Sequence, residues 1–427
     1  MGSESRCCSA WKVQKGCRIE QRSAVAWNGR SEGGEDVKNI TIAIAGVGNC
    51  ASSFVQGLEY YRGRHAKEHA GLMHASIGGW RPSDIEVVAA FDIDYRKVGH
   101  ALEDAVSAAP NCARIFQPVL PARGVVVQMG PVMDGVADHM EDYGEDEAFR
   151  VAEAHPVDVA EALKSTGAEV LICYLPVGSE RAVRYYAQAC LDAGVAMINC
   201  VPVFLASDPE WAERFRAAGL PIVGDDIKSQ VGATIVHRSL GRLFSDRGVK
   251  LDRTYQLNTG GNTDFLNMLQ RSRLQSKKRS KTESVQSQFD ERLDAKDIHI
   301  GPSDYVSWQN DNKVAFIRME GRGFGDVPME LELRLSVQDS PNSAGVVIDA
   351  VRCARLGIER GLAGPLEGPS AYYMKSPPRQ MRDEEARREV MAFIDGGETA
   401  EEVGVTAGSV PARAVAMALQ PIDRDNP

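Results

Sequence analysis

The chain has 427 residues, of which 43% are hydrophobic and 25% are charged. These fractions are ordinary for a globular protein and exclude collagen-like, membrane-embedded and wholly disordered classes. Its formal net charge of −10 argues against a general nucleic-acid-binding surface. Because the length exceeds the usual size of a single domain, we expect two domains.

Cysteine use and hydropathy point to a compartment. The nine cysteines are scattered, with no CxxC pair and no histidine spacing of a zinc site, so we expect free thiols in a reducing environment. No stretch approaches the roughly 18 consecutive apolar residues of a membrane span. The sequence therefore predicts a cytoplasmic protein whose partners are small molecules, with neither a nucleic-acid nor a membrane partner.

Predicted strands and helices alternate from residue 39 onward. Residues 1–38 lack a hydrophobic period and are expected to form a disordered leader. The alternation that follows indicates parallel βαβ units in an α/β, Rossmann-like domain. In chain order, the predicted elements are strand 40–44, helix 54–61, strand 85–91, helix 95–106, strand 125–127, helix 157–164, strand 169–175, helix 179–193, strand 195–200, helix 209–218 and strand 221–224.

The pattern changes after a predicted helix over residues 233–244. Three segments then alternate with period 2, as in a sheet with one solvated face: residues 253–258, 314–320 and 330–337. We therefore expect an α+β domain with a largely antiparallel sheet.

A further helical segment, residues 344–359, could dock back on the first domain and make that domain discontinuous. The expected division is 1–38 leader, 39–247 and 341–394 Rossmann-like domain, 248–340 second domain, and 395–427 accessory tail.

The loop Gly46-x-Gly48-x-x-Ala51 follows a predicted strand and opens a predicted helix, as a dinucleotide fingerprint requires. Gly46 permits the tight turn, Gly48 lets the backbone reach a pyrophosphate, and Ala51 allows close packing. Asp92, at the end of the second strand, would accept hydrogen bonds from a ribose and favour NAD over NADP. Asp92 is separated from the glycines by more than the usual spacing of about 20 residues, because an insert at residues 62–84 lies between them. Alternatively, the glycines only form a turn and Asp92 caps the next helix.

Four later segments are polar in places where folding alone does not require it. Their basic cluster, which includes Lys278, could hold a phosphate or, if a lysine is desolvated, supply a base. Alone, such a cluster is more often a solvated face, and the asparagine-rich segment could be a simple turn. The segments are Gly224-Asp225-Asp226-Ile227-Lys228-Ser229, residues 258–267, residues 276–281 and Asp311-Asn312-Lys313.

Together these motifs resemble the inositol-phosphate synthase family, also called the myo-inositol-1-phosphate synthase family, in its shorter bacterial form. The matching segments run in family order from about residue 40 to residue 394. They are Gly46-Val47-Gly48-Asn49-Cys50-Ala51-Ser52-Ser53, residues 224–229, 258–262 and 276–281, Asn312-Lys313-Val314-Ala315, Gln338-Asp339-Ser340 and Tyr373-Met374-Lys375-Ser376-Pro377.

The resemblance implies a cyclisation of glucose 6-phosphate to an inositol phosphate without net redox change. NAD oxidises C5, C6 loses a proton and attacks the C1 aldehyde, and NADH reduces the C5 ketone. It also suggests a homotetramer assembled through the second sheet and an assisting divalent or monovalent cation, for which the residues show no diagnostic ligand spacing.

The resemblance assigns roles to individual residues. Lys277 is the expected acid-base group, Lys313 and Lys375 stabilise oxyanions, and Lys281 helps to hold phosphate. The expected site is completed by Asp226 and Asp339, which orient the ammonium groups, by Asn258, Asn262, Ser276, Lys278 and Ser280 on the substrate, and by Gly46, Val47, Gly48, Asn49, Cys50, Ala51, Ser52, Asp92 and Ser229 on the cofactor.

Two other functions fit parts of the sequence. An NAD(P)-dependent dehydrogenase with an α+β second domain would share the loop but would show net redox turnover. A non-catalytic NAD-sensing protein would leave the lysine and asparagine motifs unexplained. A lysine or aspartate from these motifs could also form a purely structural ion pair.

Overall fold

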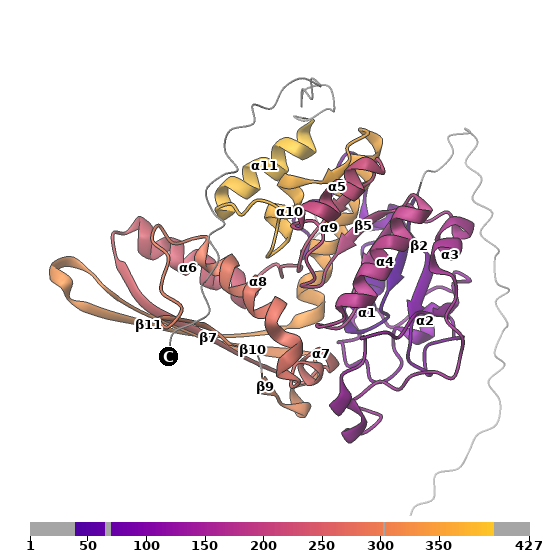
Figure 1. The fold of residues 1–427 in the computed structure, drawn as a ribbon, viewed down its shortest axis with the longest axis horizontal. Coiled ribbons are helices and arrows are strands. Elements are labelled where there is room, and N and C mark those ends of the chain that lie inside the picture. The colour runs from indigo at the N-terminus through magenta and orange to yellow at the C-terminus, as the bar shows by residue number, and fades with distance from the viewer. Residues whose placement is uncertain (1–38, 65–69, 302–303, 397–427) are drawn as a thin grey trace, which may run out of the picture. The chain divides into compact units, whose positions relative to one another are not determined.

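The computed structural model describes residues 39–64, 70–301 and 304–396. Seven strands form a parallel sheet in the order β12-β6-β5-β4-β1-β2-β3, which contains the 3-2-1-4-5-6 order of dinucleotide-binding folds (Figure 1). The strands are β1 (Ile40–Ala45), β2 (Ile85–Asp92), β3 (Val127–Met129), β4 (Val170–Cys173), β5 (Ala196–Asn199), β6 (Pro221–Val223) and β12 (Gly364–Pro365).

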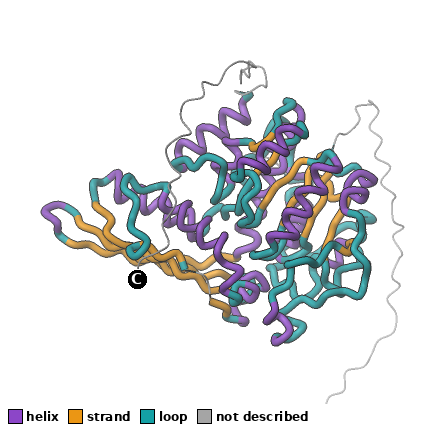
Figure 2. Tube along the Cα trace, in the orientation of Figure 1, coloured by secondary structure: helices purple, strands orange, loops and turns teal. Residues whose placement is uncertain are grey.

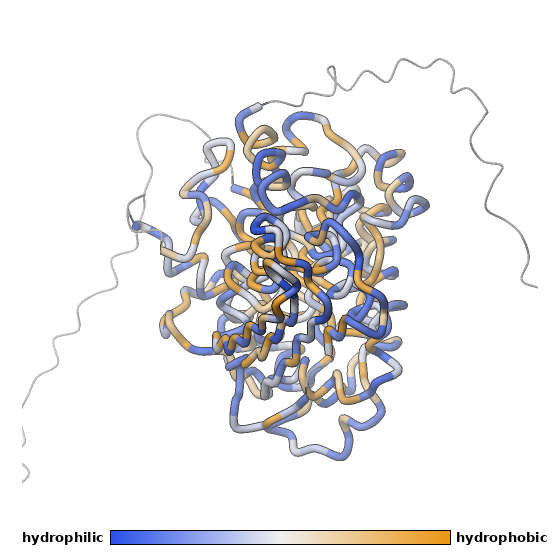
Figure 3. The backbone as a smooth tube through the Cα atoms, turned by 90° about the vertical axis from the view of Figure 1, so that its left-hand side faces the viewer, coloured by the Kyte–Doolittle hydropathy of each residue, from blue (hydrophilic) through white to orange (hydrophobic). Residues whose placement is uncertain are grey.

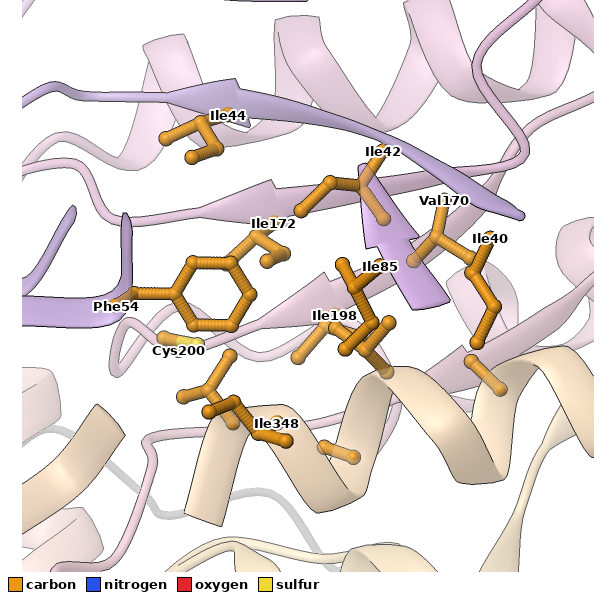
Figure 4. Packing of buried hydrophobic residues seen from close by; sticks show 14 of the residues in the cluster. Ile40, Ile42, Ile44, Phe54, Ile85, Val170, Ile172, Ile198, Cys200 and Ile348 are labelled. Carbon is orange, nitrogen blue, oxygen red and sulfur yellow. The ribbon is translucent and has the colours of Figure 1, made fainter. Parts of the chain in front are cut away.

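Helices cover both faces of this sheet, so its strands read as continuous apolar runs. On one face, α1 (Asn49–Tyr60) and α9 (Asp339–Glu359) pack on the isoleucines of β1, and Phe54 and Ile348 meet there (Figure 4). The other face carries α3 (Val159–Thr166), α4 (Glu180–Ala193) and α5 (Pro209–Ala217). In Figure 3, many of the most hydrophobic stretches of the described residues lie near the centre of the view.

Local signals set several helix ends. The Asp158 side chain accepts a hydrogen bond from the Glu161 N–H at the start of α3, and Gly167 ends that helix with φ +65°. α5 begins with Asp208 as its N-cap and a proline in its first turn. The remaining helices are α2 (Leu102–Ala105), α6 (Ala233–Asp246), α7 (Thr263–Asn267), α8 (Gln275–Gln286), α10 (Glu367–Tyr373) and α11 (Asp383–Asp395).

The second sheet is mixed. Its long strands β7 (Lys250–Gly260), β10 (Asn312–Arg322) and β11 (Pro328–Gln338) are antiparallel, whereas β8 (Ile298–Ile300) and β9 (Asp304–Tyr305) pair parallel to β7. Helix α6 lies along one face, where Phe244 packs on Ile317 and Met319 (Figure 2). The other face presents Leu257 opposite Phe316.

The mixed α/β class and both sheets agree with the sequence prediction, but one predicted helix is largely wrong. Residues 95–106 form turns and only the short α2, because Gly99 has φ +83° and the chain turns Lys97 inward. The helix predicted at 344–359 is α9, which begins at Asp339 and packs on α1, β5 and β6. The expected leader, and the tail beyond residue 396, lie outside the described residues.

A buried ion pair ties the segment after α1 to α9. The carboxylate of Asp349 and the guanidinium of Arg352 form an ion pair in which both side chains are fully buried. Arg352 also donates to the carbonyl oxygens of His74 and Ala75, and His74 Nδ1 lies 2.5 Å from Asp349 Oδ2. Both ends of the pair therefore depend on each other for their charge compensation.

We expect Asp349→Ala to lower the free energy of unfolding by about 3–5 kcal/mol, because it leaves the Arg352 charge buried without a partner. Urea unfolding followed by circular dichroism measures this change. The control is Glu384→Ala, which removes a similar but exposed helical pair with Arg388 and should have no measurable effect. Equal effects of the two substitutions would contradict the assigned role of burial.

Candidate functional site

One cavity lies at the carboxyl ends of the parallel strands, where open α/β sheets bind ligands. Its wall combines the loop after β1, the ends of β2 and β4, the segment after β6, strand β7 and the starts of β10 and α9. Residues 232–340 thus contribute one side and the parallel sheet the other. The predicted site residues that line it are Gly46, Gly48, Asn49, Cys50, Asp92, Asp226, Ser229, Asn258, Asn262, Lys277, Lys281, Lys313, Asp339 and Lys375.

The two glycines of the first loop differ in their backbone conformation and in the space around them. Gly46 has φ +93°, and a Cβ there would come within 2.8 Å of the Tyr174 carbonyl oxygen. Gly48 has an ordinary φ of −87°, and a Cβ there would meet nothing within 4 Å. Packing therefore requires the first glycine, whereas the second leaves open space beside a helix N-terminus that no side chain caps.

The peptide groups of Val47 are held from both sides. Its N–H donates to Asp92 Oδ2 at 2.6 Å, and its carbonyl oxygen accepts a hydrogen bond from Lys97 Nζ at 2.8 Å. Lys97 is only 3% exposed and also donates to Asn111 Oδ1. Burial lowers the Lys97 pKa, while Asp92 and Asp94 act against this effect. The end of β2 thus fixes the loop that follows β1.

Three lysines facing the cavity each pair with a different carboxylate. The carboxylates come from the segment after β6, from α7 and from the first residue of α9, so three distant parts of the chain meet here. The pairs are Lys277–Asp264 at 3.0 Å, Lys313–Asp339 at 2.5 Å and Lys375–Asp226 at 2.8 Å.

The paired groups oppose the effect of burial on one another, although the Lys375 pKa still falls below its ordinary value because burial outweighs Asp226. Burial alone would raise the pKa values of Asp226 and Asp339, but the neighbouring lysines outweigh it and hold both below the ordinary value. Burial would likewise lower the pKa of Lys277, but Asp264 and the two other carboxylates hold it above its ordinary value. Asp226 also has φ +63°, an uncommon conformation for aspartate that is found at functional sites.

Lys281 differs from the other three lysines. It lies one turn after Lys277 on α8, is 8% exposed, and has no carboxylate within ion-pair distance among the described residues. Burial lowers its pKa well below the ordinary value, and the three neighbouring ammonium groups lower it further. The cavity therefore contains one cation more than its carboxylates compensate, which favours an anionic ligand.

The asparagine-rich segment, residues 258–267, comprises the end of β7, a turn and α7. Asn262 is the N-cap of α7 and donates to Asp311 Oδ1 at 3.0 Å. Asp311 also accepts hydrogen bonds from the Ser340 side chain and N–H, so it joins this turn to the start of α9. Burial and the nearby Asp339 raise the Asp311 pKa to about 6.

Some predicted residues do not reach the cavity. The side chain of Ser276 donates to Glu180 at 2.8 Å. Lys278 is exposed, because it lies outside the buried face of α8, which includes Ser280, Lys281 and Ser284. Ser280 is buried and donates to Asp226, so it contacts the site through that carboxylate. In the first loop, Val47, Ala51 and Ser52 support the turn and helix from behind the cavity wall.

The structure also adds residues that the sequence reasoning did not select. Asp264 lines the cavity beside Lys277, and its position within the asparagine motif was an available signal. Lys97 had no usable signal, because its role depends on contacts with residues distant in sequence. Asp311 stands in the polar segment Asp311-Asn312-Lys313, but its contacts with Asn262 and Ser340 could not be read from that segment. Asp225, which precedes Asp226, is fully buried and accepts hydrogen bonds from Asn199 and Ser207, so it is structural.

Known proteins are similar to this chain over most of its length. Residues 232–340 match the family described as myo-inositol-1-phosphate synthase. Over 369 residues the chain is 54% identical to a Mycolicibacterium smegmatis protein named inositol-3-phosphate synthase, covering 85% of this chain and 99% of the relative. The chain belongs to the myo-inositol-1-phosphate synthase family.

Further relatives agree with this family and fold. A Corynebacterium glutamicum protein named inositol-3-phosphate synthase is 53% identical over 361 residues, which cover 83% of this chain and 98% of the relative. The crystal structure of a myo-inositol-1-phosphate synthase-related protein from Thermotoga maritima superposes with a TM-score of 0.69 at 21% identity, covering 84% of this chain and 98% of that chain. The latter likeness supports the fold.

In the described part of the chain, no group of three histidine, cysteine or acidic side chains is arranged to hold a metal ion. None of its helices is long and apolar enough to cross a membrane.

The two loop glycines give a paired prediction. Gly46→Ala should lower the free energy of unfolding by about 1–2 kcal/mol, because it forces a positive φ and a contact with Tyr174. Gly48→Ala should leave stability unchanged or raise it by about 0.4–1 kcal/mol, because its φ is ordinary and the space is open. Chemical denaturation of both variants measures these values. A larger loss for Gly48→Ala would show that packing requires the second glycine as well.

Proposed function

We propose that the chain is an inositol-3-phosphate synthase, an intramolecular lyase of the isomerase class that converts D-glucose 6-phosphate into 1D-myo-inositol 3-phosphate with catalytic NAD. The observation that carries this proposal is the group of four lysines, three of them paired with carboxylates, in the same cavity as the glycine-rich loop. The reaction is the first step of inositol and inositol-phospholipid biosynthesis.

The residues around the glycine-rich loop fit NAD. Gly48 leaves room for a close approach of phosphate, and the uncapped N-terminus of α1 offers N–H groups to it. Asp92 supplies the acidic group that disfavours a ribose phosphate, and Ser229 would lie at the cofactor end toward the lysines. The chemistry supplied by NAD in this position would be a hydride acceptor for C5 of the sugar and, later in the same turnover, the hydride that reduces C5 again.

The lysines supply proton transfer and charge stabilisation. Lys277 must lose its own proton to solvent before it can take the proton of the C5 hydroxyl, and its raised pKa opposes that loss. As the ammonium group it then returns this proton to the C5 oxygen at the end. Lys313 and Lys375 stabilise the negative charge that develops on the C1 and C5 oxygens. Asp339 and Asp226 keep these two ammonium groups oriented.

The phosphate of the substrate would bind at Lys281, the cation without a carboxylate partner. A phosphate dianion there compensates the excess charge and favours the ammonium form of this lysine. Asn258 and Asn262 would position sugar hydroxyls. Ser280 acts on the site by its hydrogen bond to Asp226, and neither Ser276 nor Lys278 is needed for this arrangement.

The proposal includes a domain division, an assembly and a compartment. Residues 39–247 and 341–394 would serve as the NAD-binding domain, and residues 248–340 as the catalytic and oligomerisation domain. The open face of the second sheet, with Leu257 and Phe316 both more than 40% exposed, supports a homotetramer formed there. The six cysteines that the structure describes are free thiols, which supports a cytoplasmic location.

The deciding experiment incubates the purified protein with glucose 6-phosphate and a catalytic amount of NAD. We expect inositol phosphate in many-fold excess over NAD. Lys277→Met should lower product formation by about 10²–10⁴-fold, because it removes the acid-base group. Lys278→Met, on the exposed side of the same helix, should leave the rate within about twofold. NADH accumulating in proportion to substrate would instead identify a dehydrogenase, and NAD binding without any turnover would identify a sensor.

Lys281→Met separates binding from folding. We expect a KM for glucose 6-phosphate about 10–100-fold higher, because a charge-assisted contact to phosphate is lost. We also expect a higher free energy of unfolding, since a buried cation without a partner is replaced by an apolar side chain. Steady-state kinetics and urea unfolding measure the two effects. A variant that is less stable than the parent would show that Lys281 has a structural role.

A further inference from the structure

A row of buried polar side chains leads from the cavity into the interior along β7. Thr254, Gln256 and Asn258 alternate along the strand, so they share a face, and each is at most 5% exposed. Gln256 and Asn258 line the cavity. At the inner end of the row, α6 places the fully buried His237 against Thr254.

The hydrogen bonds of Thr254 determine which nitrogen of His237 carries the proton. The Thr254 hydroxyl donates its single proton to the Arg318 carbonyl oxygen at 2.7 Å. His237 Nε2 lies 2.8 Å from the same hydroxyl and must therefore be the donor in that contact. Burial lowers the His237 pKa to about 4, with Gln256 acting in the opposite direction, so the ring is neutral near pH 7. Its Nδ1 is then an acceptor.

The amides of Gln256 and Asn258 can satisfy this acceptor in one orientation only. With Gln256 Nε2 donating to Asn258 Oδ1 at 3.1 Å, three buried atoms have no partner among the described residues: His237 Nδ1, Gln256 Oε1 and Asn258 Nδ2. An amide has the same shape after a half-turn, so its partners decide its orientation. A half-turn of both amides lets Gln256 Nε2 donate to His237 Nδ1 and Asn258 Nδ2 donate to Gln256 Oε1.

We propose that His237 and Gln256 are positioning residues that turn the Asn258 carbonyl oxygen toward the cavity, where it accepts a hydrogen bond from a hydroxyl group of the sugar phosphate. The direction of the whole row follows from the proton on His237 Nε2. The order of these hydrogen bonds is a property of the protein alone, whereas the identity of the hydroxyl donor rests on the proposed function.

This arrangement makes Asn258 selective for a donor. A substrate hydroxyl can supply a proton to the Asn258 oxygen, but a carbonyl or ether oxygen at the same position cannot. An analogue without that hydroxyl leaves the buried oxygen unpaired, which strongly disfavours its binding. The row thus contributes to substrate selection without direct contact between His237 and the ligand.

Nitrogen-15 NMR of histidine-labelled protein tests the hydrogen-bond order directly, without substrate. We expect His237 to show a protonated Nε2 and an unprotonated Nδ1 at pH 7, with its signals identified by their loss in His237→Asn. The same ring should remain neutral at pH 5.5. A protonated Nδ1 or a charged ring at pH 7 would overturn the proposal, whatever the enzymatic activity.

A pair of substitutions tests the effect on the substrate. The Asn oxygen in His237→Asn can replace the Nδ1 acceptor, whereas the Gln amide in His237→Gln can replace only the Nε2 donor. We expect His237→Gln to raise the KM for glucose 6-phosphate by about tenfold, with a smaller change in kcat, and His237→Asn to stay near the parent value. Equal KM values for the two variants would contradict the proposal.

Gln256→Glu provides a third variant that retains the size of the side chain in case changes at His237 impair folding. A carboxylate cannot donate to His237 Nδ1, so the KM should rise as in His237→Gln, and an unchanged KM would overturn the proposal. Tyr255→Phe, on the opposite face of β7, is the matched control and should not change KM. Failure of the parent protein to form inositol phosphate would refute the proposed function, while the NMR measurement would still decide the hydrogen-bond order.

Discussion

The mutual compensation of buried lysines and carboxylates is the constraint on which the site depends. Burial lowers the pKa of an isolated ammonium group in such a cavity, as it does at Lys281, because desolvation favours the neutral form. A carboxylate pairs with each of the other three lysines, and at Lys277 the carboxylates outweigh the effect of burial on the pKa. The fourth lysine, Lys281, has no carboxylate partner among the described residues, and this excess positive charge favours an anion beside it.

The fold brings these charges together from both sheets. The parallel sheet supplies Asp226 after β6, the second sheet supplies Lys313 at the start of β10, and α8 supplies Lys277 and Lys281 one turn apart. Helix α9 joins the two parts, since its first residue pairs with Lys313 while its middle packs against α1 and the parallel strands. A shift of α9 would therefore move Asp339 relative to both the glycine-rich loop and the lysines.

Periodicity and motifs predicted most of the fold. Alternating apolar runs indicated the parallel strands, and period-2 segments indicated β7, β10 and β11, because these patterns record which faces are buried. The stretch around Lys97 was misread as a helix. Its composition suits a helix, but Gly99 and the contact between Lys97 and Val47 override this local preference. The parallel pairing of β8 and β9 with β7 likewise depends on long-range contacts.

The sequence likewise predicted only part of the candidate site. The motifs indicated which segments meet. Thirteen of the fourteen predicted residues at the cavity wall are glycines or polar residues, which stand out from the apolar pattern of the sequence. The motifs could not indicate which residues of the basic segment face inward, so Lys278 and Lys281 looked equivalent before the phase of α8 was known. Nor could they show that Asp311 connects Asn262 to Ser340, because that contact joins three separate elements.

The row behind Asn258 extends the same principle from charges to hydrogen bonds. Asn258 alone could present either a donor or an acceptor, and its chemical identity does not choose between them. The choice is made at His237, where a single hydroxyl proton on Thr254 requires the imidazole to donate from Nε2. A buried polar group of the cavity wall therefore acquires a defined direction only through neighbours that the ligand never touches, just as the lysines acquire their charges only through neighbouring carboxylates.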